Sequence, residues 1–162
     1  MGRLCSLEEM KAERLRLRNA GRRLVFTNGV FDILHRGHCE YLADARAHGD
    51  ALVVGLNSDE SVHRLKGPTK PIVGQEDRAA VLSALRAVDY VVIFGEDTPI
   101  DLITHLLPDV LIKGGDYALD DIVGRAEVEA AGGQVLTIPL TEGRSSTNII
   151  STIIERYCTH ER

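Results

Sequence analysis

Two histidines three residues apart, His35 and His38, stand where an apolar segment gives way to a helical pattern, in the stretch TNGVFDILHRGH (residues 27–38). Imidazoles that point the same way from the first turn of a helix can bind an anion, because free backbone N–H groups and the positive end of the helix dipole lie beside them. Gly37 lets a ligand approach the backbone closely. A helix cap or a pair of zinc ligands would use the same residues, but zinc needs a third ligand, and the sequence has neither CxxC nor HExxH. The pair alone therefore leaves an anion site and a structural role open.

The segment RLKGPTKPIVGQEDR (residues 64–78) is punctuated by glycine and proline and carries Lys66 and Lys70. A basic loop beside a ligand can close over phosphates and neutralise their charge, although exposed loop lysines commonly have no such role. Arg78 falls on the apolar stripe of the helix that follows. A guanidinium directed at the interior needs a buried partner, which is either a carboxylate of the protein or a bound phosphate.

Two further segments place glycines or hydroxyls beside a strand end or a helix start. In KGGDY (residues 113–117), Gly114 would let a base or ribose lie against the backbone and Asp116 would accept from hydroxyls, although a tight turn would use the same residues. The segment TEGRSSTNII opens the final helix with three hydroxyl residues, Ser145, Ser146 and Thr147. Such residues are helix caps by default, but at a second helix N-terminus they can also hold part of a polyphosphate.

Apolar segments alternate with helical patterns along the chain, which predicts the elements that position these residues. Strands are expected at 24–27, 51–57, 90–94, 110–113 and 134–140, and helices at about 6–21, 38–48, 75–86, 98–107, 122–131 and from 147 onward. Near-continuous apolar strands are typical of a parallel sheet covered on both faces. We predict a single doubly wound, Rossmann-like α/β domain with a five-stranded parallel sheet. In such a sheet, ligands bind beyond the carboxyl ends of the strands, where all the loops described above would lie.

The final helix should face the core through a stripe of apolar residues: Ile149, Ile150, Ile153, Ile154 and Tyr157. The sequence has no GxGxxG after its first predicted strand and no GxxxxGK[ST]. If the ligand carries phosphates, the loops described above must therefore hold them.

Composition limits the partners and the compartment. The 162 residues are 44% apolar with a net charge of −5, which argues against a surface that binds nucleic acid or an anionic membrane. Three cysteines without regular spacing predict neither a disulfide framework nor a zinc ribbon. The N-terminal segment is charged throughout, and no run of eighteen apolar residues occurs, so we expect a cytoplasmic protein.

Taken together, GVFDILHRGH, KGGDY and RSST resemble the cytidylyltransferase-type nucleotidyltransferases over about residues 22–157. The set FTNGVFDILHRGH, GLNSDESV, RLKGPTKPI and SSTNII is similar, more narrowly, to the adenylyltransferase domain that makes ADP-heptose. This resemblance implies transfer of AMP from ATP, accompanied by Mg²⁺, to the sugar 1-phosphate D-glycero-β-D-manno-heptose 1-phosphate, with release of pyrophosphate. We expect an N-terminal helical extension (residues 1–22) before a nucleotidyltransferase domain (residues 23–162).

The resemblance implies roles for individual residues, with no set of protein ligands for a metal. The expected catalytic residues are His35, His38 and Lys66. The expected nucleotide- and phosphate-binding residues are Thr27, Asn28, Gly29, Phe31, Gly37, Arg78, Lys113, Gly114, Asp116, Ser145, Ser146 and Thr147. The expected acceptor-binding residues are Asp32, Asn57 and Lys70. Because relatives commonly pair, a homodimer is expected, with Leu15, Leu17 and Tyr157 as exposed candidates for the contact.

Two alternatives remain at this point. The same chemistry could act on glycerol 3-phosphate with CTP, or the domain could bind nucleotides without turnover. Ile150 stands three residues after Thr147, where some relatives carry a basic residue, and this argues against the pantetheine-phosphate branch. The heptose enzyme is often fused to a sugar kinase that this sequence does not contain, which leaves the acceptor and the base open.

Overall fold

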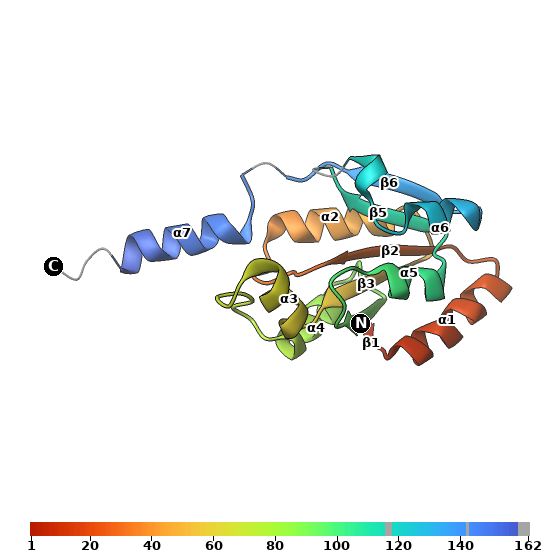
Figure 1. Cartoon of the computed structure of the whole chain (residues 1–162), viewed down its shortest axis with the longest axis horizontal. Helices are drawn as coiled ribbons and strands as arrows, with labels where there is room; N and C mark the ends of the chain where they lie inside the picture. The colour runs from red at the N-terminus through yellow and green to blue at the C-terminus, as the bar shows by residue number, and fades with distance from the viewer. Residues whose placement is uncertain (116–117, 142, 159–162) are drawn as a thin grey trace.

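A six-stranded parallel sheet with helices on both faces forms the body of the computed structural model, which describes residues 1–115, 118–141 and 143–158 (Figure 1). The strands are β1 (Arg3–Leu4), β2 (Leu24–Gly29), β3 (Ala51–Asn57), β4 (Tyr90–Phe94), β5 (Val110–Gly114) and β6 (Gln134–Ile138). The helices are α1 (Leu7–Asn19), α2 (Arg36–Arg46), α3 (Asp59–Lys66), α4 (Gln75–Ala84), α5 (Ile100–Leu106), α6 (Arg125–Ala130) and α7 (Ser146–Tyr157), with a 3₁₀ turn at Leu119–Asp121. The predicted fold class is confirmed, with one strand more than predicted.

The strand order β1-β4-β3-β2-β5-β6 places a topological switch point between β2 and β5. From β2 the chain proceeds outward through β3 to β4, whereas β5 returns to the other side of β2 and is followed by β6. Loops that leave neighbouring strands in opposite directions open a crevice at the carboxyl edge of the sheet. The loops after β2 and β5 therefore border the expected ligand site.

Alternate residues of the central strands feed two separate apolar cores. Phe26 of β2 packs with α1, α5 and α6 on one face, whereas Val25 packs with α2 and α4 on the other. Both side chains are fully buried. Because each face needs an apolar side chain, the strands show the near-continuous apolar pattern from which the parallel sheet was predicted.

The first 22 residues contribute to this same body. β1 adds an edge strand beside β4, and α1 begins with a capping box between Ser6 and Glu9 and buries Met10 completely. The side chain of Arg14, 5% exposed, donates to the carbonyls of Leu106 and Leu107 and to both carboxylate oxygens of Asp109. Arg14 is thus a buried basic residue that joins α1 to the segment before β5.

Several element boundaries differ from the predicted ones. β1 was missed because two exposed residues carry no apolar pattern and pair through their backbone. α3 was missed because eight residues with one buried apolar side chain, Val62, show no helical stripe, although Ser58 caps the helix by accepting from the N–H of Ser61. α6 begins at Arg125, three residues later than predicted, because the 3₁₀ turn precedes it.

The expected packing of the final helix is wrong. α7 extends away from the body as an arm (Figure 1), and none of its residues is buried. Its stripe leaves Ile153 48%, Ile154 53% and Tyr157 77% exposed. The apolar period was real, but the helix leaves the body, so Ile149 and Ile150 near its start are partly covered and the rest of the stripe is exposed. Leu17, expected to be exposed, is instead fully buried.

We predict that Leu17→Ala lowers the free energy of unfolding by about 2–5 kcal/mol, because it removes a completely buried side chain and leaves a cavity. Leu15→Ala, on the exposed side of the same helix, is the matched control and should change it by less than about 0.5 kcal/mol. Urea denaturation followed by circular dichroism measures both. Equal, small effects would show that α1 does not contribute to the stability of the domain.

Candidate active site

Two adjoining cavities lie at the carboxyl ends of β2 and β5. The smaller has a volume of about 290 Å³ and the larger about 660 Å³. Their shared lining comes from β2, the loop after it, α2, β5 and α7: Asn28, Gly29, Val30, Phe31, His38, Lys113 and Ser146. The crevice predicted from topology is therefore a real hollow, and most of the predicted site residues line it.

The two predicted histidines form a stacked pair at the cavities, where His38 lines both and His35 lines the smaller one. His35 is the N-cap residue of α2, and the rings of His35 and His38 are stacked with centroids 3.9 Å apart and planes inclined by 21°. The Nδ1 atoms of both rings are buried and have no hydrogen-bond partner in the described part of the chain. A cap through the His35 side chain is not formed, so the structural role that the sequence left open does not account for the pair.

Burial lowers the pKa of both imidazoles. The pKa of His38 falls from its usual 6.5 to about 4, chiefly because the ring is desolvated and then because His35 lies beside it. The pKa of His35 is also lowered, by burial and then by the positive charge of Arg144. Both rings are neutral at pH 7, and an arriving polyanion would raise their pKa values again because it stabilises the charged form.

The loop after β2 is held in a strained conformation against this pair. Phe31 has φ +48°, in the left-handed region that residues other than glycine rarely adopt, and its ring meets the His38 ring edge to face at 5.3 Å. A Cβ on Gly37 would lie 3.1 Å from the Cβ of Arg144 and 3.2 Å from the His35 ring, so the absence of a side chain allows the close approach of α2 to the loop before α7. Both features bring backbone close to the cavities.

The N-terminus of α7 forms a second helix end at the smaller cavity. The Ser145 hydroxyl caps the helix by accepting from the N–H of Asn148, while the Ser146 hydroxyl donates to the carbonyl oxygen of Ile33 at 3.1 Å. Ser146 and Thr147 also line the larger cavity. Ser145 thus both caps the helix and lines the smaller cavity, so the capping role and the site role, given as alternatives from sequence, do not exclude each other.

The larger cavity contains the predicted cationic and acceptor-side residues. Lys66, Lys70, Asp32 and Asn57 all line it, and the Lys70 Nζ atom lies 3.5 Å from Oδ2 of Asp32. Asp32 is 7% exposed and Lys66 is exposed at the end of α3. The cavity therefore combines two cations with groups that can bind hydroxyls.

Two of the predicted residues that the structure describes line neither cavity. Thr27 is fully buried, with its Oγ1 atom 2.7 Å from the hydroxyl oxygen of Tyr41. Arg78 is 1% exposed and donates to protein carbonyls and to Asp59, so the structure shows the protein partner that the sequence gave as one of two alternatives. Asp116 lies outside the described residues.

Sequence reasoning missed lining residues on two other segments. Thr141 and Arg144 line the smaller cavity from the segment before α7, and Thr98 lines the larger one from the segment before α5. The Thr141 hydroxyl donates to Glu40 of α2 at 2.7 Å, which ties this segment to the histidine helix. The one signal for Arg144 in the sequence was its position, as a basic residue directly before the N-cap residue Ser145.

Four buried polar atoms without a hydrogen bond surround the cavities. They are Oδ1 of Asn28, Oδ2 of Asp32 and the Nδ1 atoms of His35 and His38; within the residues that the structure describes, one further such atom, Oγ of Ser83, lies elsewhere. A buried polar group without a partner is costly, so a cluster of them indicates a place where a ligand supplies the partner. Residues 1–115, 118–141 and 143–158 include no group of three or more side chains able to hold a metal ion. They also include no helix both long and apolar enough to cross a membrane.

The cytidylyltransferase-like family matches residues 26–152, and the chain belongs to this family. This confirms the family and the nucleotidyltransferase class predicted from the motifs. Among curated proteins, the chain is 58% identical over 137 residues to the bifunctional protein HldE of Geobacter sulfurreducens, covering 85% of the chain and 28% of that protein. It is 53% identical over 148 residues to the protein of the same name from Methylobacillus flagellatus, covering 91% and 30%. The chain thus spans less than a third of the length of these relatives.

Solved structures agree on the fold. The lipopolysaccharide core biosynthesis protein from Thermoplasma volcanium is 31% identical with a TM-score of 0.62, over 76% of this chain and 100% of that chain. Pantoate-beta-alanine ligase from Francisella tularensis, solved with beta-gamma ATP and beta-alanine, has a TM-score of 0.61 over 96% of this chain and 76% of that one. At 14% identity this second likeness shows the fold alone.

We predict that stability falls as the pH is lowered from 6.5 to 4. In this window the unfolded imidazole binds a proton, near its usual 6.5, before the folded His38 does, near 4, so protonation favours the unfolded chain. Unfolding free energies measured across this range should show the slope, and His38→Gln should reduce it. In NMR titration the His38 ring should remain neutral at pH 5.5; a midpoint at or above 6.5 would contradict the prediction.

Proposed function

We propose that the protein transfers AMP from ATP to D-glycero-β-D-manno-heptose 1-phosphate, giving ADP-heptose and pyrophosphate. The observation that carries this proposal is the cluster of buried polar atoms without a hydrogen bond between two helix N-termini at the switch point, with lysines on the adjoining cavity. The motif set similar to ADP-heptose synthesis supports the acceptor. So do the high identity to the proteins named HldE and the likeness to a lipopolysaccharide core biosynthesis protein.

The reaction needs positioning and charge stabilisation more than a strong base. An oxygen of the sugar phosphate attacks the α-phosphorus, a bond forms between them, and the bond from the α-phosphorus to the bridging oxygen breaks to release pyrophosphate. Because the nucleophile is already anionic, the barrier lies in bringing two anions together and stabilising the in-line displacement. A site built from cations, N–H groups and imidazoles is suited to this step.

The histidine pair is assigned to the triphosphate. His35 and His38 lie at the N-terminus of α2, where free N–H groups also point toward an anion, and their neutral rings can donate hydrogen bonds to phosphate oxygens. Because the two rings carry little charge in the free protein, no counter-ion has to leave them before the triphosphate binds. Charge on the rings would develop as the triphosphate binds, where it stabilises the reacting phosphate.

The lysines and the larger cavity are assigned to the acceptor and to the transferred phosphate. Lys66 lies at the end of α3 and Lys70 in the loop that follows, so both can neutralise an incoming sugar phosphate. Asn57 and Thr98 offer hydrogen bonds to sugar hydroxyls from two other segments. The smaller cavity, lined by Gly114 and Ser145, is assigned to the nucleotide.

Mg²⁺ is proposed to arrive bound to the triphosphate. It is commonly held by one or two carboxylates plus substrate phosphates, and the described side chains form no cluster of three or more metal ligands. The bound ion supplies neutralisation of phosphate charge. The steps described above are carried by the chain's own residues.

We also propose a homodimer, with the exposed stripe of α7 as its contact. Ile153, Ile154 and Tyr157 lie on one side of a helix that leaves the body, and pairing with a second copy would remove their apolar surface from water. In an interface with two-fold symmetry, each copy would contribute this same stripe.

The proposed activity predicts pyrophosphate release with ATP and heptose 1-phosphate. The measurement is a panel of ATP, CTP, GTP and UTP, each with heptose 1-phosphate, glycerol 3-phosphate or no acceptor. His35→Ala and His38→Ala should each lower turnover by about two orders of magnitude or more without unfolding the protein, because charge stabilisation in the transition state is lost.

The same panel separates the alternatives. Release with CTP and glycerol 3-phosphate alone would replace the proposed acceptor and base. Nucleotide binding without release under any condition would indicate a binding module, and near-normal turnover in both histidine variants would reject the mechanism.

The proposed dimer predicts a mass of two chains by sedimentation velocity. Ile153→Ser combined with Tyr157→Ser should shift the protein to monomer, because polar side chains remove the apolar surface that drives pairing. Ser151→Ala, off the stripe on the same helix, is the control. A wild-type protein that stays monomeric at the highest concentration tested contradicts this interface.

A further inference from the structure

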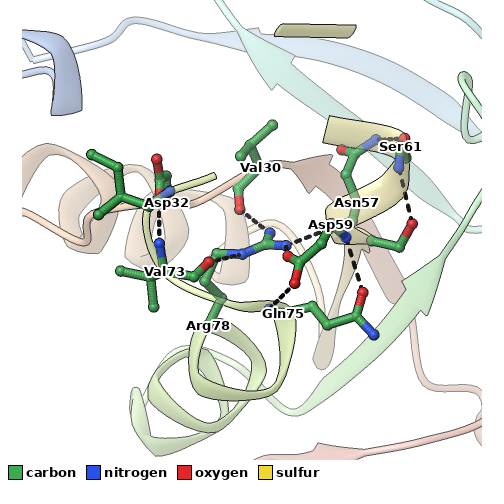
Figure 2. A network of polar contacts seen from close by, with 10 residues as sticks. Val30, Asp32, Asn57, Asp59, Ser61, Val73, Gln75 and Arg78 are labelled. Atoms are coloured by element: carbon green, nitrogen blue, oxygen red, sulfur yellow. Dashed lines mark hydrogen bonds and ion pairs between the residues drawn. The ribbon is translucent and has the colours of Figure 1, made fainter. Parts of the chain in front are cut away.

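Arg78 is a fully buried guanidinium that joins three segments around the larger cavity (Figure 2). It donates from Nε to the carbonyl oxygen of Val73 at 2.9 Å, from Nη1 to that of Val30 at 2.6 Å, and from Nη2 to that of Asn57 at 2.9 Å. Its Nη2 also lies 2.7 Å from Oδ1 of Asp59. The loop after β2, the end of β3 and the segment between α3 and α4 therefore meet on one side chain.

Asp59 couples the two helices that flank this segment. Its Oδ2 accepts from the N–H of Gln75, the first residue of α4, and the Gln75 side chain accepts in return from the N–H of Asp59, the first residue of α3 (Figure 2). The N-terminus of α3 is thus tied to the N-terminus of α4, the helix that follows the segment from 67 to 74, which carries Lys70 and follows Lys66.

Asp32 holds the same segment from the histidine side. Its Oδ1 accepts from the backbone N–H groups of Ile72 and Val73, at 2.8 and 2.9 Å. Val73 is therefore gripped twice, by Asp32 through its N–H and by Arg78 through its carbonyl (Figure 2). The loop after β2 and the lysine segment are thus joined by the hydrogen bonds of Asp32 and Arg78.

Phe31 lies between the two anchored residues Val30 and Asp32. It holds the left-handed φ of +48° and places its ring against His38. A residue in this conformation persists only where its surroundings hold it, and here both neighbours are bonded to the same network. The network thereby connects the lysine segment to the histidine pair through a strained turn.

We propose that Arg78 is a positioning residue for nucleotidyl transfer, which fixes the Phe31 turn against His38 and the Lys66–Gly74 segment over the larger cavity. It acts through these groups, without touching substrate itself. This inference rests on the proposed function for its kinetic consequence, whereas its structural consequence can be measured in the free protein. Lysine cannot replace arginine here, because one ammonium group cannot reach carbonyls on three segments in the geometry of the guanidinium fork.

Arg78→Lys tests the proposal, with Arg14→Lys as the matched control. Arg14 is also buried, at 5% exposed, and also joins backbone carbonyls to one aspartate, but it lies beside the start of β2, at the opposite end of the strand from the site. The two substitutions should cost similar stability. In the folded protein, Arg78→Lys should lower kcat on the order of 100-fold, as expected for misplaced catalytic groups, whereas Arg14→Lys should leave kcat near the wild-type value.

Hydrogen exchange in the free protein gives a readout that does not depend on activity. The N–H groups of Ile72 and Val73 should exchange about tenfold faster or more in Arg78→Lys and at the wild-type rate in Arg14→Lys, because only the first change loosens their segment. If Arg78→Lys does not fold, Asp59→Asn, which keeps the side-chain shape and removes the charge facing Arg78, takes its place with the same readouts.

The outcomes separate this inference from the proposed function. Wild-type exchange rates at Ile72 and Val73 in Arg78→Lys overturn the network, and an equal loss of kcat in Arg14→Lys overturns a positioning role in favour of general stability. If the wild-type protein releases no pyrophosphate with any acceptor, the proposed function fails. Faster exchange in Arg78→Lys, without a change in Arg14→Lys, would still show that Arg78 holds the Lys66–Gly74 segment in place.

Discussion

A buried polar group must find a partner, and this single requirement divides the carboxyl edge of the sheet into a frame and a site. The frame consists of groups that the chain satisfies itself, such as Arg78 with three carbonyls and Asp59. The site consists of groups that the chain leaves unsatisfied, including the inward nitrogens of His35 and His38. The satisfied and the unsatisfied groups lie within the same few loops. The hydrogen bonds of the frame therefore hold in position the groups that remain available to a ligand.

Charge at the site is distributed in a way that suits an anionic substrate. The imidazole pair is neutral because burial lowers both pKa values, while the cationic Lys66 lies exposed at the edge of the larger cavity. Stacked rings 3.9 Å apart could not both carry charge without repulsion, which adds to the effect of burial on His38. The free protein therefore keeps a low charge at the histidine pair and has the exposed cation of Lys66 at the larger cavity.

Sequence reasoning recovered the elements that have a clear apolar period and lost those that do not. The strand at Ala51–Asn57 was predicted with its observed bounds, because seven buried residues run together. α3, eight residues long with one buried apolar side chain, was read as loop despite its Ser58 cap. For the site, residue types and the resemblance together pointed to His35, His38 and Lys66, which line the cavities, whereas Thr98 reaches the larger cavity through packing that no local pattern encodes.

The sequence by itself determined the parallel sheet and the edge at which the chemistry gathers, because apolar periodicity and the order of the segments are local properties. The tertiary structure decided which polar residues face a ligand and which face the protein. Arg78 could have met a phosphate or a carboxylate, and only the meeting of residues 30, 57, 59 and 73 around it settled the matter. The stripe of α7 shows the converse: its period was readable, but whether anything covers it depends on surfaces far away in the chain.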